Sequence, residues 1–146
     1  MTQSVMQDRK SGPDWPLGLI VVTVPGTPVG FMSLVDPNAY NAPETATVPQ
    51  SDEYGGGLCQ QIIVQGFNSN AGTGLQPNTG NVYIMRKGAQ GLGNRTDFGA
   101  MVYVVLPGQS IVVSSAAPNL NSFSPYRYYL DADNANDGAL ITLLVQ

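Results

Sequence analysis

The chain contains no histidine and a single cysteine, Cys59, among its 146 residues. Without histidine there is no Ser-His-Asp or Cys-His arrangement and no ordinary zinc site, so most hydrolase chemistry is excluded. A lone cysteine cannot form an internal disulfide, which argues against a small secreted scaffold held together by disulfides. Cys59 begins the apolar segment CQQIIVQ, where we expect a small buried hydrophobic side chain rather than a nucleophile. The sequence therefore predicts a protein that is not an enzyme and uses no cofactor.

Charged residues are also scarce, at 11% of the chain against the roughly 25% that is usual for soluble domains. A surface so poor in charge is covered by Ser, Thr, Asn, Gln and Gly. Such a surface suits permanent contact with other protein subunits, so the composition favours a protein that works in an assembly. The formal net charge is −4 with only six Lys and Arg residues, so the clustered positive face that nucleic-acid binding needs is not expected.

No long hydrophobic run is present. The longest, LGLIVVTV, is far shorter than the ~20 residues needed to span a bilayer, and the N-terminal MTQSVMQDRKSGPDWP lacks the apolar centre of a signal peptide. We expect a soluble protein made in a cytoplasm, with no membrane partner.

What the sequence does contain is strand signals, because runs rich in Val, Ile, Tyr and Thr alternate with Gly, Pro and Asn. Pro-Gly stands between apolar runs in VPGTP and LPGQS, which is typical of tight turns. These features predict an all-β, single-domain antiparallel β-sandwich, jelly-roll-like, with about eight strands. The predicted strands are Leu17–Val24, Val29–Val35, Cys59–Phe67, Asn81–Arg86, Phe98–Leu106, Ser110–Ser114, Arg127–Asp131 and Ala139–Val145, and the glycine-rich residues 70–81 are predicted to be a loop.

Two segments do not fit a compact sandwich. Residues 1–16 are predicted to be an N-terminal arm preceding a domain over 17–146, and residues 36–57 a long loop within that domain. Trp15 near the end of the arm has two interpretations: it straps across a partner subunit, or it caps the core of its own domain. Interface anchors are usually Trp, Tyr and Arg, so the candidate partner contacts are Arg9, Trp15, Tyr40 and Tyr54.

The stretch YLDADNANDGALITLL is the most suggestive of site chemistry, because it holds Asp131, Asp133 and Asp137 within seven positions. An EF-hand loop that starts at Asp133 would have Ala135 at its third position and Leu144 at its twelfth, where oxygen ligands are required. A turn between two strands, with Asn-Asp-Gly as a hairpin signal, explains the stretch better. The sequence leaves open a calcium site of another kind on this loop.

Three nearby tyrosines offer a second candidate site. Tyr126, Tyr128 and Tyr129 could form a platform for a sugar, but in a strand Tyr126 and Tyr128 share one face and Tyr129 lies on the other. One face of a sandwich strand is core, so packing is favoured over binding. The other carboxylates show no sign of a shared cleft, which a glycosidase would need.

Over residues 59–145 the chain resembles small virion proteins of tailed bacteriophages. The resemblance rests on CQQIIVQGF, on NTGNVYIMRKG with its N-T-G-x-V-Y strand, on the P-G-x-S turn in LPGQSIVVSS, and on the terminal Y-x-D-A-D…D-G stretch. It implies a structural role on the particle, as a head decoration or capsid cement protein. Such proteins are commonly homotrimers that sit over capsomer junctions and tie major capsid subunits together, and no catalytic residue is carried over from them.

These observations give one expected function and one alternative. The first is a capsid decoration or cement protein on the outside of the virion, assembled in the host cytoplasm, with the major capsid protein and its own copies as partners. The alternative is a receptor- or carbohydrate-binding module, a head fibre or tail-associated adhesin, with Tyr126, Tyr128, Asp131, Asp133 and Asp137 as its candidate residues.

Overall fold

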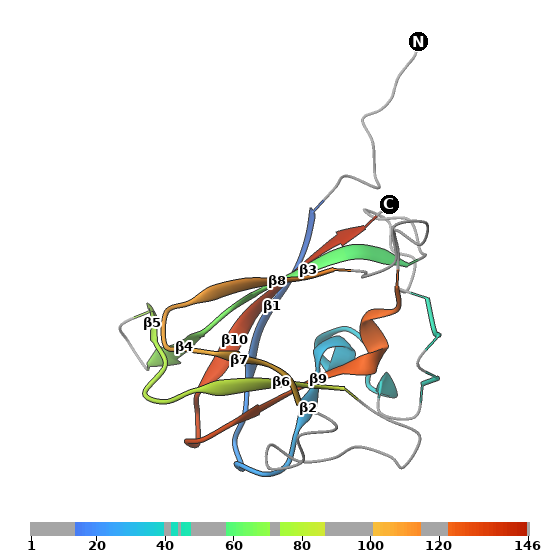
Figure 1. Cartoon of the computed structure of the whole chain (residues 1–146). Coiled ribbons are helices and arrows are strands. Elements are labelled where there is room, and N and C mark those ends of the chain that lie inside the picture. Colours follow the sequence, from blue (N-terminus) through green and yellow to red (C-terminus); the bar gives the residue numbers. More distant parts are fainter. Residues whose placement is uncertain are drawn as a thin grey trace.

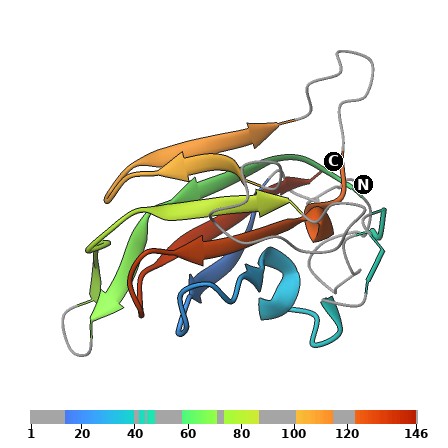
Figure 2. The same ribbon diagram turned by 60° about the horizontal axis from the view of Figure 1, so that its bottom comes forward.

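The chain folds into a sandwich of two four-stranded antiparallel sheets, with a separate two-stranded hairpin at one end (Figure 1; Figure 2). The computed structural model describes residues 14–39, 42–43, 45–47, 58–70, 74–86, 101–114 and 123–145. The strands are β1 (Asp14–Val21), β2 (Val29–Gly30), β3 (Cys59–Gln65), β4 (Phe67–Asn70), β5 (Gly74–Pro77), β6 (Val82–Arg86), β7 (Met101–Val105), β8 (Ser110–Ser114), β9 (Tyr128–Ala132) and β10 (Gly138–Val145).

The strand order is that of a jelly roll. The first sheet has the order β1-β10-β3-β8 and the second has β2-β9-β6-β7, and every pairing in them is antiparallel. If the β4–β5 hairpin is set aside, eight strands remain, and early strands alternate with late ones in both sheets, as in a double-sheet jelly roll. The predicted fold class is therefore confirmed, and β4–β5 is an insertion between the third and fourth strands of the roll.

The core lies between the two sheets because alternate residues of each strand point inward. Helical structure in the described ranges is limited to short 3-10 helices such as η1 (Phe31–Leu34) and η3 (Pro125–Arg127), and no described helix is long and apolar enough to cross a membrane. The ring of Tyr128 contacts those of Phe31 and Phe123, with centroids 6.2 and 5.7 Å away. The largest fully buried side chains are Phe31, Ile20, Met32, Ile62, Ile84, Met85, Leu130, Ile141, Leu143, Val22 and Val64.

Several predicted strands end earlier than expected or are shorter. The strand predicted over Val29–Val35 ends at Gly30, and the chain turns into η1. The reason is that the consecutive residues Phe31 and Met32 are both fully buried in the same core, whereas a strand would point them to opposite faces. The strand predicted over Cys59–Phe67 stops at Gln65, and β4 begins after Gly66.

The prediction of a loop over residues 70–81 is wrong for its middle part. β4 and β5 form a hairpin in which Phe67 lies opposite Pro77 and Asn70 opposite Gly74. Their sequences, FNSN and GLQP, are polar and contain Gly and Pro, so they lack the apolar alternation by which strands are recognised.

The predicted turn after β9 exists, but the predicted hairpin does not. β9 belongs to the second sheet and β10 to the first, so the turn carries the chain from one sheet to the other (Figure 1). Asn136 in this turn has a left-handed backbone (φ 72°), and its N–H donates to the carbonyl of Val22 at 2.8 Å. Gly138 must be glycine, because a Cβ there would overlap the carbonyl oxygen of Ile20.

The described part of the predicted arm belongs to the sandwich. β1 begins at Asp14, so the expected boundary between residues 16 and 17 falls inside a strand. Trp15 lies opposite Leu143 of β10 and packs, half-buried, against the main core. This position agrees with the interpretation that Trp15 caps the core of its own domain. Arg9, Tyr40 and Tyr54 lie outside the described residues, and their role as partner contacts stays a prediction.

Candidate functional site

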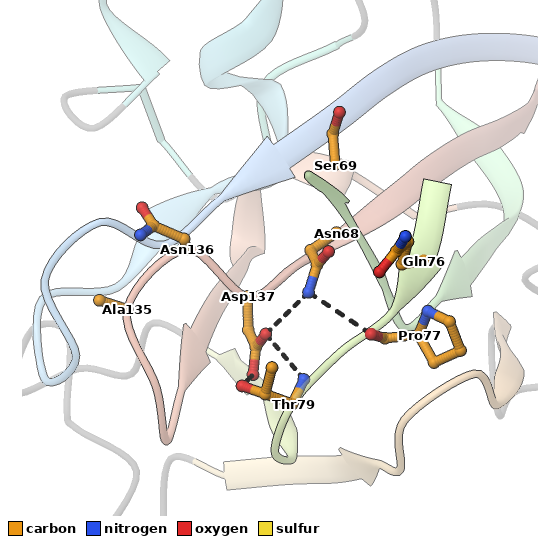
Figure 3. Close-up of a pocket in the computed structure, with 8 residues that line it drawn as sticks. All are labelled: Asn68, Ser69, Gln76, Pro77, Thr79, Ala135, Asn136 and Asp137. Carbon is orange, nitrogen blue, oxygen red and sulfur yellow. Dashed lines mark hydrogen bonds between the residues drawn. The ribbon is translucent and has the colours of Figure 1, made fainter. Parts of the chain in front are cut away.

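The side chain of Asp137, which follows the turn between the sheets, is a buried carboxylate held by hydrogen bonds from the same chain. It is 1% exposed, and its carboxylate accepts four hydrogen bonds. Those from Asn68 and Thr79 are drawn in Figure 3. Oδ1 accepts from Nδ2 of Asn68 at 3.1 Å and from N of Thr79 at 2.9 Å. Oδ2 accepts from Oγ1 of Thr79 at 3.0 Å and from N of Gly80 at 2.8 Å. A carboxylate offers about four lone-pair positions, so this one is saturated by its own chain.

Asn78 makes a second link at the same place. The side chain is buried, and it pairs with the peptide groups of Gly138 in the way a neighbouring strand would. Nδ2 of Asn78 donates to the carbonyl of Gly138 at 2.7 Å, and N of Gly138 donates to Oδ1 of Asn78 at 3.0 Å. The turn that contains N-T-G is thereby fixed to the start of β10.

Gly66 connects the P-G-x-S turn to the same region. Its N–H donates to the carbonyl of Gln109 at 2.8 Å, and its carbonyl accepts from N of Gly108 at 2.9 Å and from N of Asn78 at 3.3 Å. A Cβ at Gly66 would lie 2.9 Å from the carbonyl oxygen of Leu106, so this approach requires glycine. Three turns that lie far apart in the sequence therefore meet at one end of the sandwich, and we name this meeting point, formed by Gly66, Asn68, 78–80, 107–110 and 137–138, the polar joint.

The other two aspartates of the stretch have different partners. Oδ1 of Asp131, which is fully buried, accepts from N of Gly26 at 2.9 Å and from N of Ala132 at 2.8 Å. Asp133 is exposed, and its two oxygens accept from the hydroxyl of Tyr83 at 2.9 and 3.0 Å. No group of three or more Cys, Asp or Glu side chains among the described residues is arranged to hold a metal ion. Each aspartate instead fixes a different part of the fold.

A pocket of about 240 Å³ opens beside Asp137, between the β4–β5 hairpin and the turn after β9 (Figure 3). It is lined by Asn68, Ser69, Gln76, Pro77, Thr79, Ala135, Asn136 and Asp137. The lining offers amides and hydroxyls but no aromatic ring and no basic group. Because the one carboxylate is already saturated, the lining contains no pair of groups that could act as nucleophile and base. It can hold a small neutral polar group by hydrogen bonds.

The three candidate tyrosines are buried, which confirms that they pack rather than form an exposed platform. Tyr126 and Tyr128 belong to the main core, and Tyr129 packs on the other side of the sheet with Met85. The hydroxyl of Tyr126 donates to Oδ2 of Asp36 at 2.7 Å. Burial is the first cause that raises the pKa of Tyr126, followed by the hydrogen bond to Asp36 and the charge of that carboxylate.

Cys59 is fully buried, as expected of a small hydrophobic side chain. Its Sγ donates to the carbonyl of Phe123 at 3.4 Å, and burial raises the pKa of the thiol to about 12. A thiol with so high a pKa is almost never a thiolate at neutral pH, so it is a poor nucleophile.

The sequence marks Asp137 as a candidate but does not reveal its donors, Asn68, Thr79 and Gly80, or the role of Asn78. The segment containing Asn78–Gly80 was recognised only as a turn. The available signal was chemical: a buried carboxylate without a nearby cation needs several neutral donors, and Asn-Thr-Gly offers an amide, a hydroxyl and accessible N–H groups within three residues.

Comparison with known proteins finds no match among protein-family models, curated sequences or solved structures. The resemblance to phage virion proteins therefore rests on the motifs quoted above.

Proposed function

We propose that the protein is a structural component of a tailed-bacteriophage particle, a decoration protein that binds the outer surface of the head and stabilises it. Its partners in this proposal are the major capsid protein and further copies of itself, and it has no catalytic activity. The proposal places the protein on the exterior of the virion.

The polar joint carries the proposal. The N-T-G, P-G-x-S and D-G motifs on which the resemblance rests meet there, and their polar groups bind the chain to itself. Asp137 is buried and saturated by four donors, so the motif residue best suited to chemistry has a structural task. Motif residues that bind the chain to itself indicate a structural protein, and a structural protein acts through the surface that it presents to its partners. A fold alone does not imply a function, so the jelly-roll strand order is compatible with the proposal but is not evidence for it.

The experiment that tests the proposal uses phage heads that lack this protein. Heads and purified protein are mixed, sedimented and analysed for bound chain, and the temperature at which the heads disrupt is measured with and without the protein. We expect saturable binding, at a ratio to the major capsid protein fixed by the lattice, and a higher disruption temperature. Heads of an unrelated phage are the control. Binding that does not saturate, or that is equal on both kinds of head, would contradict the proposal.

The pocket beside Asp137 favours the second candidate, a carbohydrate-binding module, because its lining of amides and hydroxyls suits a neutral sugar. A glycan screen with and without calcium tests it. Binding that is lost in Gln76→Ala, which changes the lining of the pocket, would favour this candidate over the decoration protein.

A further inference from the structure

Two basic residues lie side by side at one end of the sandwich. Arg86, the last residue of β6, pairs with Tyr128 of β9 across the second sheet, and Arg127 directly precedes Tyr128 at the end of η3. Figure 1 and Figure 2 show η3 at the end of the sandwich away from the β4–β5 hairpin. Arg86 and Arg127 are the only Lys or Arg residues in the described ranges, so the positive charge of these ranges is concentrated at one place.

Two tyrosines belong to the same place. Tyr128 lies directly opposite Arg86, and Tyr103 of β7 lies opposite Ile84. Because Ile84 and Arg86 are two residues apart on one strand, these side chains share the side of the sheet that faces the core. Burial raises the pKa of the Tyr128 hydroxyl, and the positive charges of Arg127 and Arg86 oppose that rise, so both guanidinium groups lie within electrostatic reach of this hydroxyl. We name Arg86, Tyr103, Arg127 and Tyr128 the arginine site.

The two arginines receive no counter-charge from the described part of their own chain. No hydrogen bond or ion pair joins either guanidinium group to a described residue, and Nε of Arg127 is buried without a partner. Buried donors in folded proteins are nearly always paired, and two guanidinium groups placed side by side repel each other. An acceptor with a negative charge would remove both costs.

The described carboxylates are engaged elsewhere, although the protein is acidic with a formal net charge of −4. Asp131 and Asp137 are buried and accept hydrogen bonds from neutral groups of their own chain. Asp36 and Asp133 each accept from a tyrosine hydroxyl. The anions of the described ranges are therefore held by neutral donors, whereas the cations are left for an anion of another molecule.

Arg127 stands on a rigid support. The hydroxyl oxygen of Ser124 accepts from N of Tyr126 at the start of η3, and the same hydroxyl donates to the carbonyl of Ala46. The hydroxyl of Tyr126 donates to Asp36, which fixes η3 from a second side. Arg127 is half-buried, so its charge is partly shielded from water and its hydrogen bonds to an anion are stronger than those of a fully exposed arginine. A group fixed in advance also loses little freedom on binding.

We propose that the arginine site binds the carboxylates of an acidic segment of a partner protein. A guanidinium group presents a planar fork that matches a carboxylate, and two such forks beside a phenol hydroxyl can hold one or two of these groups. A nucleic acid fits less well, because a polyanion needs a longer row of cations and is repelled by the net charge of −4. That the partner is the major capsid protein rests on the proposed function, whereas the chemistry of the site does not.

The test follows the Nε–H signals of Arg86 and Arg127 by NMR in the full-length, ¹⁵N-labelled protein. Each signal is assigned by its absence in Arg86→Gln or Arg127→Gln. The probe is a short capped peptide with two adjacent glutamates, and the same peptide with glutamines in their place is its control. At low salt, where screening is weak, we expect both signals to shift and saturate with the glutamate peptide and neither to move with the glutamine peptide.

Variants separate the guanidinium fork from simple charge. Arg127→Gln should raise the Kd of the glutamate peptide about tenfold, and Arg127→Lys nearly as much, because lysine keeps the charge but lacks the fork. The control is Leu75→Glu, which lowers the net charge by one unit as Arg127→Gln does, at a residue that is 52% exposed on the distant β4–β5 hairpin. It should change the Kd less than about twofold. Thermal unfolding checks that all variants are folded.

Four results would overturn the inference. Signals that do not move with the glutamate peptide would show that there is no such site, and an equal loss of affinity in Leu75→Glu and Arg127→Gln would reduce the binding to net charge. Equal or larger shifts with inorganic phosphate would show a general anion site. Signals that move with protein concentration alone would show that a second copy of the chain is the occupant.

The peptide test contains no capsid, so it is separate from the test of the proposed function. A protein that binds the glutamate peptide but not phage heads contradicts the proposed function and leaves the arginine site in place. A protein that binds heads but not the peptide contradicts this inference alone.

Discussion

Thr79 binds Asp137 twice, through its backbone N–H at 2.9 Å and through its hydroxyl at 3.0 Å, so that one residue occupies both oxygens of a buried carboxylate. The two residues are 58 positions apart, and they join the turn before β6 to the turn before β10.

Replacing Asp137 with Asn should destabilise the fold strongly. The amide keeps the shape of the carboxylate, but its NH₂ group replaces one acceptor oxygen and faces two donors, and the two hydrogen bonds to the remaining oxygen are no longer to a charged group. We expect a loss of about 3 kcal/mol in the free energy of unfolding, measured by urea denaturation. Asp133→Asn, at an exposed position, is the control and should cost about 0.5 kcal/mol. Equal losses in the two variants would mean that the joint does not stabilise the fold.

Gly138→Ala should be far more harmful than Gly80→Ala. A Cβ at Gly138 meets the backbone of Ile20, which cannot move without shifting β1, whereas a Cβ at Gly80 meets the end of the exposed side chain of Asn134 at 2.6 Å. We expect Gly138→Ala to lose more than about 3 kcal/mol or to be insoluble, and Gly80→Ala to lose about 1 kcal/mol or less. Thermal unfolding followed by circular dichroism distinguishes them, and similar melting temperatures would contradict the close approach at Gly138.

The thiol of Cys59 should be unreactive in the folded protein. Its pKa is raised to about 12 by burial, so almost no thiolate is present at pH 8, and reagents cannot reach the sulfur. An aromatic disulfide reagent should modify Cys59 only after urea is added, and the natural protein in urea is its own control. Modification at pH 8 without urea, at a rate faster than global unfolding, would show that β3 opens locally.

Tyr126→Phe should reduce stability at pH 7 and change its dependence on alkaline pH. The variant loses a hydrogen bond to the carboxylate of Asp36, which costs about 1–2 kcal/mol. In the natural protein the pKa of Tyr126 is raised in the folded state from about 10, so its contribution is complete below pH 10 and is lost as the pH rises above it. The variant has no hydroxyl to ionise at this position, so it does not lose this contribution to stability at alkaline pH.

The difference between the natural protein and Tyr126→Phe should therefore shrink between pH 9 and pH 11. Urea denaturation at several pH values measures this difference. A constant gap over that range would mean that the hydroxyl ionises as easily in the folded chain as in the unfolded one.

Two N-terminal truncations should separate folding from attachment. Removing residues 1–13 leaves β1 complete and should keep the unfolding free energy within about 0.5 kcal/mol. Removing residues 1–16 also deletes Trp15, which packs on the core, and should cost about 3 kcal/mol. If residues 1–13 are a strap, the shorter truncation abolishes binding to heads without a change in stability. Undiminished binding would contradict the strap.

The elements that could be predicted from the sequence are those whose apolar residues reveal them. β3, β8 and β10 carry β-branched runs, and their predicted bounds differ from the observed ones by only a residue or two. β4 and β5 were missed because a hairpin of polar residues is held by backbone pairing and leaves no apolar pattern. The turn before β10 was predicted correctly, but local turn chemistry does not state which sheet the next strand enters, so the hairpin was wrong.

The candidate site was harder to predict because its residues lie far apart in the sequence. Asp137 is conspicuous in the sequence, but its donors are 57 to 69 positions away, and only the closed jelly roll brings them together. Burial also decided the role of the tyrosines, which look alike in the sequence and differ in which layer of the sandwich they fill.

β10, the last strand, lies in the middle of the first sheet between β1 and β3, with Trp15 opposite Leu143. During synthesis, β1 therefore emerges from the ribosome without its pairing partner and waits for more than a hundred residues to be added. The four-stranded sheet cannot be completed until β10 has been synthesised, and folding is expected to be slow, as in other proteins dominated by distant contacts. Until then the apolar strands are exposed, so production at low temperature or with chaperones should raise the soluble yield.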